Sequence, residues 1–161
     1  WSSDVCSSDL DQPAAGSRPG RFRRRGPRAA SLADRALRSG RSAAIYTSRE
    51  VRRAEGKDFL GFGSRVMAAL CDVVREVRIR PDFLVAKGGI TSVEIARAGL
   101  GVKEAFVPGQ IAPGVPVWEL GPETRWPGIH YVVFPGNVGD DFTLGHVVRA
   151  LSARPEGGMA Q

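Results

Sequence analysis

The sequence is poor in the residues that build disulfide frameworks and metal centres. Its 161 residues include two cysteines and two histidines, too few for a disulfide-stapled scaffold and without the ligand spacing of a zinc site. The longest apolar run, residues 129–134, is interrupted by His130, whereas a membrane-spanning helix needs about 18 or more apolar residues. We therefore expect no membrane partner, no bound structural metal, and a reducing, cytoplasmic compartment in which Cys71 is a buried, inert thiol.

The positive charge of the chain is concentrated in one short segment. There are 23 Lys and Arg residues against 17 Asp and Glu, which gives a net charge of +6 at pH 7. Six arginines lie close together: Arg18, Arg21, Arg23, Arg24, Arg25 and Arg28. Without these six the acidic and basic residues balance, so the composition does not indicate a domain that binds nucleic acid. An RNA-binding arm made from this segment is a minor alternative.

The first 28 residues differ in character from the rest of the chain. Residues 1–10 resemble the translation of a sequencing adapter, and residues 11–28 are rich in Pro, Gly and Arg without any periodicity. The second stretch is typical of a disordered linker or of out-of-frame translation, and whether it is native stays open. We expect the domain to occupy residues 29–161, as a C-terminal fragment of a longer protein.

From residue 29 onward, helical and strand patterns alternate. We expect helices over residues 31–39 (capped by Ser31), 58–77, 92–98 and 142–151, strands over 43–47, 83–86, 105–107, 117–120 and 130–134, and loops over 48–57 and 108–116. The strand over 117–120 is a candidate edge strand. Because strands alternate with helices, the pattern predicts an α/β fold with a mostly parallel sheet flanked by helices in three α/β/α layers, as a partial domain.

Two glycine-rich turns follow strands and open helices. The first comprises Gly88, Gly89, Ile90, Thr91 and Ser92, and the second comprises Gly136, Asn137, Val138 and Gly139. Thr91 and Glu94 have the spacing of a capping box, and the glycines leave backbone amides open to a phosphate at the positive end of a helix. In a parallel sheet both turns lie at the carboxyl ends of strands, where open α/β folds bind ligands. Together they are the candidate nucleotide-binding site.

Each of these features also has a plainer interpretation. Glycines make tight turns without any ligand, and neither turn has the Gly-Lys-Ser/Thr ending of a Walker loop. Residues 61–66 imitate a dinucleotide fingerprint, but they lie within a helical stripe and lack the third glycine. Asp140 and Asp141 either orient Mg²⁺ or cap a helix, and Lys87 either reaches a phosphate or is solvated.

Two further side-chain types leave the function open. Trp118 and Trp126 flank a loop and either pack there or stack on an adenine ring. His130 and His146 have no cysteine or carboxylate at metal-ligand spacing. No residue stands out as a catalytic group, so the general base stays unknown.

Four segments, in this order and spacing, resemble the C-terminal domain of the four-carbon acid sugar kinases. They are residues 46–49 (YTSR), 88–92 (GGITS), 108–116 (PGQIAPGVP) and 136–139 (GNVG). The third segment is the most specific, and the resemblance covers about residues 31–152. Members of this family phosphorylate four-carbon sugar acids such as threonate, erythronate or 3-oxo-tetronate. They use ATP bound by an α/β C-terminal domain, and their N-terminal domain holds the sugar acid.

The resemblance implies that this chain is the ATP-binding half of such a kinase. ATP contacts would come from the two glycine turns, with Mg²⁺ as cofactor, and the sugar acid would bind to an N-terminal domain that the sequence lacks. The fragment would then be inactive alone. A homo-oligomer is left open.

The chain departs from the family pattern at two places. The family usually has an acidic residue at the position of Ile90 and Lys-Ser at the positions of Phe134 and Pro135. These departures leave open which sugar acid and which hydroxyl are used, and whether activity survives. The alternative is a non-catalytic α/β ligand-binding or interaction domain that keeps the glycine turns as architecture.

Overall fold

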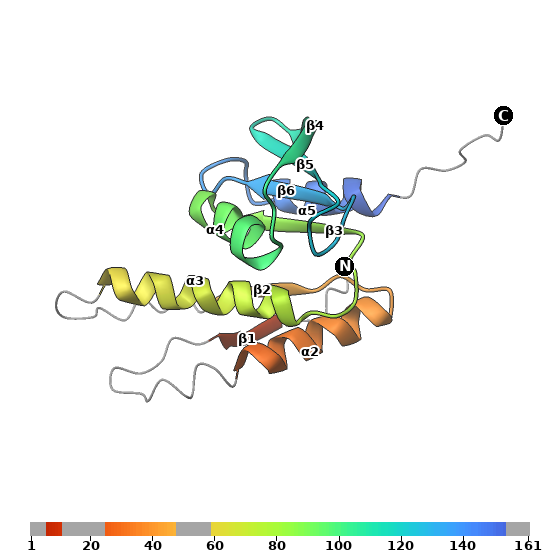
Figure 1. Cartoon of the computed structure of the whole chain (residues 1–161). Helices are drawn as coiled ribbons and strands as arrows, with labels where there is room; N and C mark the ends of the chain where they lie inside the picture. The colour runs from red at the N-terminus through yellow and green to blue at the C-terminus, as the bar shows by residue number, and fades with distance from the viewer. Residues whose placement is uncertain (1–5, 11–24, 48–58, 154–161) are drawn as a thin grey trace. The chain divides into compact units, whose positions relative to one another are not determined.

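The computed structural model describes residues 6–10, 25–47 and 59–153 (Figure 1). These residues fall into two compact units. The first contains the described residues up to Pro81 together with residues 94–100, and the second contains residues 82–93 and the described residues from Gly101 onward. Each unit has its own elements. No helix of the described ranges is long and apolar enough to cross a membrane.

The first unit combines a strand pair with three helical segments. Its elements are β1 (Cys6–Leu10), α2 (Arg25–Arg38), β2 (Ala44–Thr47), α3 (Phe59–Glu76) and the π-helix η1 (Ile95–Gly99). β1 and β2 are parallel. The Asp34 carboxylate of α2 accepts hydrogen bonds from the backbone amides of Arg78 and Ile79, at 2.9 and 3.0 Å. This carboxylate therefore fastens α2 to the segment that follows α3.

The long helix α3 covers nearly all of the helix predicted over residues 58–77. Cys71 and Val73 of α3 and Val77, directly after it, are buried, as expected for the core-facing side of a helix. The Cys71 thiol donates to the carbonyl oxygen of Glu94 at 3.5 Å. Burial therefore accounts for Cys71, as predicted from the sequence.

The helix α2 begins earlier than predicted. Ser31 lies inside it, and its hydroxyl donates back to the carbonyl of Pro27 at 2.8 Å. The expected Ser31 cap is therefore wrong, because the helix already includes Arg25–Arg28.

Residues 11–24 and the loop expected over 48–57 lie outside the described residues. The origin of the first 28 residues stays a prediction.

The second unit contains a mixed four-stranded sheet. Its elements are β3 (Phe83–Lys87), α4 (Gly89–Glu94), β4 (Ala105–Ala112), β5 (Val115–Leu120), β6 (His130–Phe134) and α5 (Thr143–Ser152). The strand order is β3-β6-β5-β4, with β3 and β6 parallel and the β6–β5 and β5–β4 pairs antiparallel. The described unit is thus a small α/β sheet, and the mostly parallel, three-layer arrangement expected from the alternation is not confirmed.

A hairpin accounts for most of this difference. The expected Pro/Gly loop over 108–116 is wrong, because β4 extends to Ala112 and β5 starts at Val115. Gly114, with a φ of +74°, closes the turn between them. β4 is the edge strand, and an edge strand tolerates a proline such as Pro108, which has no N–H group to donate. Consequently β5 lies inside the sheet, and its expected edge position is also wrong.

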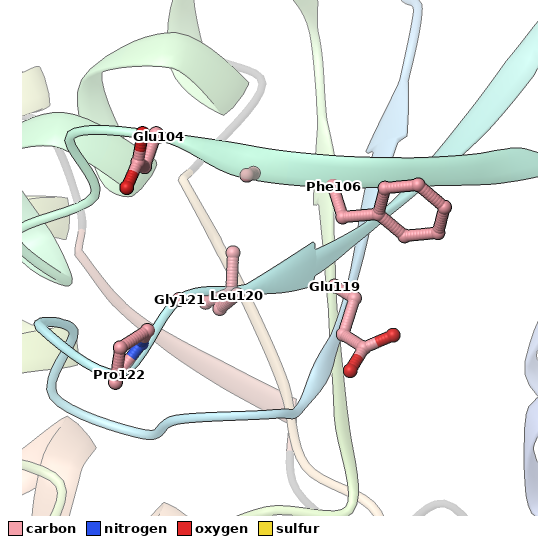
Figure 2. A pocket seen from close by; sticks show the side chains of 7 residues that line it. Glu104, Phe106, Glu119, Leu120, Gly121 and Pro122 are labelled. Atoms are coloured by element: carbon pink, nitrogen blue, oxygen red, sulfur yellow. The ribbon is translucent and has the colours of Figure 1, made fainter.

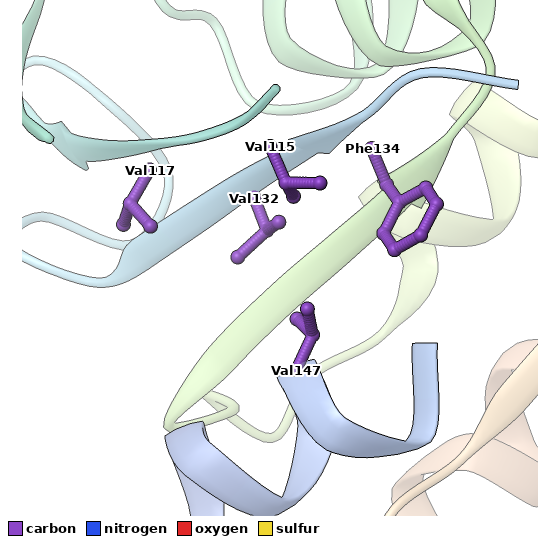
Figure 3. Packing of buried hydrophobic residues seen from close by; sticks show 5 residues of the cluster. All are labelled: Val115, Val117, Val132, Phe134 and Val147. Carbon is purple, nitrogen blue, oxygen red and sulfur yellow. The ribbon is translucent and has the colours of Figure 1, made fainter. Parts of the chain in front are cut away.

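The core of the second unit lies between one face of the sheet and α5 (Figure 3). It is made of Val115 and Val117 from β5, Val132 and Phe134 from β6, and Val147 from α5. Side chains alternate along a strand, so Tyr131 points to the opposite face. There its hydroxyl donates to the carbonyl oxygen of Ser92 in α4 at 2.6 Å. The helices α4 and α5 therefore cover opposite faces of β6.

Candidate functional site

The two glycine turns lie side by side. They follow β3 and β6, which are parallel neighbours whose last residues, Lys87 and Phe134, are paired in register. The Gly88 amide donates to the Phe134 carbonyl oxygen at 2.8 Å. A Cβ atom placed on Gly136 would be 4.0 Å from the Gly88 Cα. The structure therefore brings together the two segments that the sequence singled out.

The first turn is held from inside by Ser92. This residue is fully buried, and its hydroxyl lies 2.7 Å from both the Ala86 and the Gly88 carbonyl oxygens, which share its single proton. Its backbone amide also donates to the Gly88 carbonyl, at 2.8 Å. Gly88 has a φ of +108°, in the region that favours glycine. Ser92 therefore fixes the shape of the turn rather than facing outward.

The outer residues of the first turn are differently placed. Ile90 has an exposed fraction of 79%, and Gly89 has open space where a Cβ would be. The predicted capping box of Thr91 and Glu94 is wrong, because α4 already begins at Gly89 and Thr91 is inside it. The Glu94 carboxylate instead pairs with Arg97, at 3.0 Å. Thr91 and Glu94 have the spacing of a capping box, but the helix does not begin at Thr91, so its side chain has no free first-turn amide to cap.

The second turn leads into α5 through a carboxylate cap. The Asp140 Oδ1 atom accepts hydrogen bonds from the amides of Phe142 and Thr143, both at 2.9 Å, and from the Thr143 hydroxyl at 2.7 Å. The Thr143 hydroxyl accepts in turn from the Asp140 amide, at 2.9 Å. These bonds, led by that of the Thr143 hydroxyl, hold the pKa of Asp140 below its usual value. The capping interpretation of Asp140 is therefore confirmed.

The remaining residues of the second turn connect it to the hairpin. Asn137 is exposed and Val138 is half-buried, packed against the core cluster of β5, β6 and α5. A Cβ on Gly114 would lie 3.5 Å from both Val138 methyl groups. The hairpin turn between β4 and β5 thus packs beside the second glycine turn. This contact could not be predicted from the sequence, because the hairpin resembles a Pro/Gly loop there.

The tryptophans are packed away from the turns. Trp126 is buried in the connection that precedes β6. The glycine turns follow the carboxyl ends of β3 and β6, which are the opposite ends of these strands. Trp118 packs against the Tyr131 ring, with centroids 5.9 Å apart. The packing interpretation therefore accounts for both, and neither is placed as a platform for an adenine ring.

A shallow hollow lies at the other end of the sheet (Figure 2). It is lined by Glu104, which precedes β4, and by residues of β4, of β5 and of the segment after β5, among them Phe106 and Glu119. Glu119 is paired across the sheet with His130, the first residue of β6, whereas the second glycine turn follows the last. The hollow is therefore separate from the candidate site.

Two other sequence features can be placed. Residues 61–66 lie within α3, so they do not form the strand-to-helix turn of a dinucleotide fingerprint. In the described ranges, no group of three or more His, Cys, Asp or Glu residues is arranged to hold a metal ion.

Comparison with known proteins identifies the domain. A family model described as a nucleotide-binding C-terminal domain matches residues 6–144, which include both glycine turns and the hairpin. Searches of curated proteins and of solved structures found no significant match. The match covers most of the chain, and the protein therefore belongs to the family of nucleotide-binding C-terminal domains.

Proposed function

We propose that the two adjacent glycine turns bind ATP. On this proposal the chain is the nucleotide-binding half of a cytoplasmic kinase that transfers the γ-phosphate of ATP to a hydroxyl of a four-carbon sugar acid. The observation that carries the proposal is the Gly88–Phe134 hydrogen bond, which ties the first turn to the end of β6, the strand that leads into the second turn. The family match supports nucleotide binding, and the resemblance of the sequence to four-carbon acid sugar kinases supports the choice of acceptor.

The geometry suits a polyphosphate because the two turns present bare backbone at one edge of the sheet. Gly89 has no neighbouring atom where a Cβ would be, and at Gly136 the nearest one is 4.0 Å away. Backbone amides in such turns donate hydrogen bonds to phosphate oxygens. Glycine at these two positions therefore serves the approach of a ligand, since the protein itself leaves room for a Cβ atom at both.

A magnesium ion would enter the site with the nucleotide. Proteins hold Mg²⁺ through one or two carboxylates together with substrate phosphates, and the ion neutralises charge on the transferred phosphoryl group. Asp140 Oδ1 already accepts three hydrogen bonds. The exposed carboxylate beside it, Asp141, fits the requirement better and is the residue we assign to Mg-ATP.

The acceptor side of the reaction belongs to a different domain in the family that the sequence resembles. Phosphoryl transfer depends on positioning an acceptor hydroxyl in line with the γ-phosphate. We therefore expect the 161-residue chain to bind ATP and to show little or no ADP release with threonate or erythronate. Clear release of ADP in a coupled assay would contradict the expectation that a separate domain must bind the acceptor.

A second candidate function is a non-catalytic ligand-binding or interaction domain. The observation that favours it is the apolar character of the turns, because Ile90 is exposed where a carboxylate would serve a kinase, and the second turn follows Phe134 and Pro135. The two candidates differ in their ligand: the kinase half binds Mg-ATP, and the alternative does not.

The test is thermal unfolding of the whole chain with and without Mg-ATP. A ligand present at about 100 times its dissociation constant adds about 2.7 kcal/mol to the free energy of unfolding. The key variant is Gly136→Val, because a Cβ atom there would meet no atom closer than 4.0 Å, so that the variant should keep its fold while the added side chain blocks the ligand. The shift should disappear in this variant.

The matched control is Gly63→Val. Gly63 also has open space around it and lies in the segment of α3 that imitates a dinucleotide fingerprint. Its Mg-ATP shift should equal that of the wild type. An absent shift in the wild-type chain, or an equal shift in Gly136→Val, would argue against a nucleotide site at the turns and favour the non-catalytic alternative.

A further inference from the structure

We propose that the Lys87 ammonium group supplies the positive charge that binds the phosphates of the ligand at the two glycine turns. The inference rests on the proposed function and assigns the charged residue of that same site. Lys87 ends β3 and immediately precedes Gly88. Its backbone pairs in register with Phe134, the last residue of β6. It therefore stands where both turns begin.

The side chain of Lys87 is held beside the turns by an aromatic ring. Its Nζ atom lies 4.4 Å from the centroid of the Phe134 ring, and the ring itself is buried in the core of the second unit. A cation over an aromatic face is attracted by the ring quadrupole. The contact keeps the ammonium group over Phe134, which lies two residues before Gly136 of the second turn, while the Lys87 side chain as a whole remains exposed.

No carboxylate of the described residues forms an ion pair with Lys87. An aromatic ring is an incomplete partner for an exposed ammonium ion, because it supplies no hydrogen-bond acceptor oxygen for the three N–H donors. Phosphate oxygens supply such acceptors, and a lysine binds phosphate as a point charge. The free donors of Lys87 therefore match the chemistry of the proposed ligand.

The charges around the turns favour such a cation. Two carboxylates follow the second turn. Asp141 is the one assigned to Mg²⁺, whereas Asp140, which is engaged in the cap of α5, repels a polyphosphate. The other Lys and Arg residues of the described second unit lie outside the turns: Lys103 precedes β4, Arg125 lies over the Trp126 ring at 5.4 Å, and Arg149 is in the last turn of α5. Lys87 is the basic residue adjoining a glycine turn.

A purely structural role would need only the aliphatic stem. Lysine stems cover apolar surface while their head groups stay in water, and a methionine would cover Phe134 equally well. Lys87→Met therefore separates the charge from the covering stem, and Lys87→Arg restores a charge. Lys103→Met removes a charge of the same type from the segment before β4 and is the matched control.

The experiment is titration calorimetry of the whole chain with Mg-ATP and, separately, with inorganic tripolyphosphate. Lys87→Met should weaken the binding of both ligands by about tenfold or more, with an unchanged melting temperature in the absence of ligand. Lys87→Arg should recover part of the affinity, and Lys103→Met should bind like the wild type. Raising the salt concentration should weaken the wild type more than Lys87→Met, because salt screens the charge interaction.

The outcomes separate this inference from the proposed function. Equal Mg-ATP affinity in Lys87→Met and the wild type would overturn the role of Lys87 and leave the nucleotide site standing. Lys87-dependent binding of tripolyphosphate without binding of ATP would support the phosphate role and reject the proposed function. Binding of neither probe by the wild-type chain would overturn both.

Discussion

The amide of Gly88 donates to the carbonyl oxygen of Phe134 at 2.8 Å, across the ends of β3 and β6. This bond extends the strand pairing past Lys87 by one residue, so that the first glycine turn leaves the sheet beside the second. Two kinds of glycine result. Gly88 and Gly139 have φ values of +108° and +80° that the fold requires, whereas Gly136 has no such constraint. Substitutions at the two kinds should therefore have different effects.

Gly139→Ala should destabilise the protein. A Cβ atom at this position would lie 2.6 Å from the Cβ and Oγ1 atoms of Thr143, which belongs to the cap of α5, and the positive φ alone disfavours alanine by about 1–2 kcal/mol. We expect the free energy of unfolding to fall by at least that amount in urea denaturation monitored by circular dichroism.

The control for this prediction is Gly145→Ala in the same region of the chain. Gly145 lies inside α5 with open space around it, and replacing a glycine in a helix interior by alanine stabilises it by about 0.5–1 kcal/mol. The two variants should thus change stability in opposite directions. Destabilisation by both would show that α5 tolerates no added methyl group, and the argument from backbone conformation at Gly139 would fail.

Val147→Ala should weaken the core of the second unit. Val147 is the buried residue by which α5 packs against Val132 and Phe134 of β6. Removing its two methyl groups loses apolar burial and leaves a cavity, which together amount to about 2 kcal/mol. The matched control is Leu144→Ala on the same helix, where the side chain is 38% exposed. Denaturant titration should show the larger loss for Val147→Ala, and equal losses would contradict the assigned packing face.

The strands β3 and β6 could be predicted to within a residue from the sequence, because short, nearly continuous apolar runs are typical of buried strands. The hairpin of β4 and β5 could not. Its Pro108 and Gly114 are typical loop residues, and they fit strands only because β4 is an edge and the turn needs a positive φ. The expectation of a mostly parallel sheet arose because this hairpin was not predicted. The hairpin reverses the direction of β5, so that β5 is antiparallel to both of its neighbours, β4 and β6.

The candidate site shows the same division. The positions of both turns were predictable, since each glycine pair follows an apolar strand. The roles inside the turns depend on contacts distant in sequence. Thr91 has the spacing of a cap, yet Ser92 makes the internal hydrogen bonds, and its partner Tyr131 lies 39 residues away. A single sequence carries no signal for that contact.

The cap of α5 should make stability depend on pH. The folded-state pKa of Asp140 is lowered, first by the Thr143 hydroxyl and then by the Phe142 amide. A carboxyl group with a depressed folded pKa stabilises the fold above its unfolded pKa of about 3.9, and this contribution is lost as the pH falls through the folded pKa. Asp140→Ala should therefore melt below the wild type at pH 7, and the difference should narrow below about pH 4.

The neighbouring carboxylate provides the control for this pH dependence. Asp141 is exposed and is not the residue that accepts the capping bonds. Asp141→Ala should show little difference from the wild type from neutral to acidic pH in the same melting experiments. If Asp141→Ala showed a pH-dependent loss of stability and Asp140→Ala showed none, the capping carboxylate would be Asp141 and the assignment to Asp140 would be wrong.

The thiol of Cys71 should be unreactive in the folded protein. Burial raises its pKa, and the charge of Arg75 opposes this effect without cancelling it, so less of the nucleophilic thiolate is present at a given pH. In a Cys6→Ser variant, which leaves Cys71 as the only thiol, iodoacetamide at pH 8 should react at least about tenfold more slowly with the native than with the urea-unfolded chain. Mass spectrometry of the alkylated fraction over time measures both rates. Equal rates would mean that the interior of the first unit opens readily, and the packing of α3 described above would then be in error.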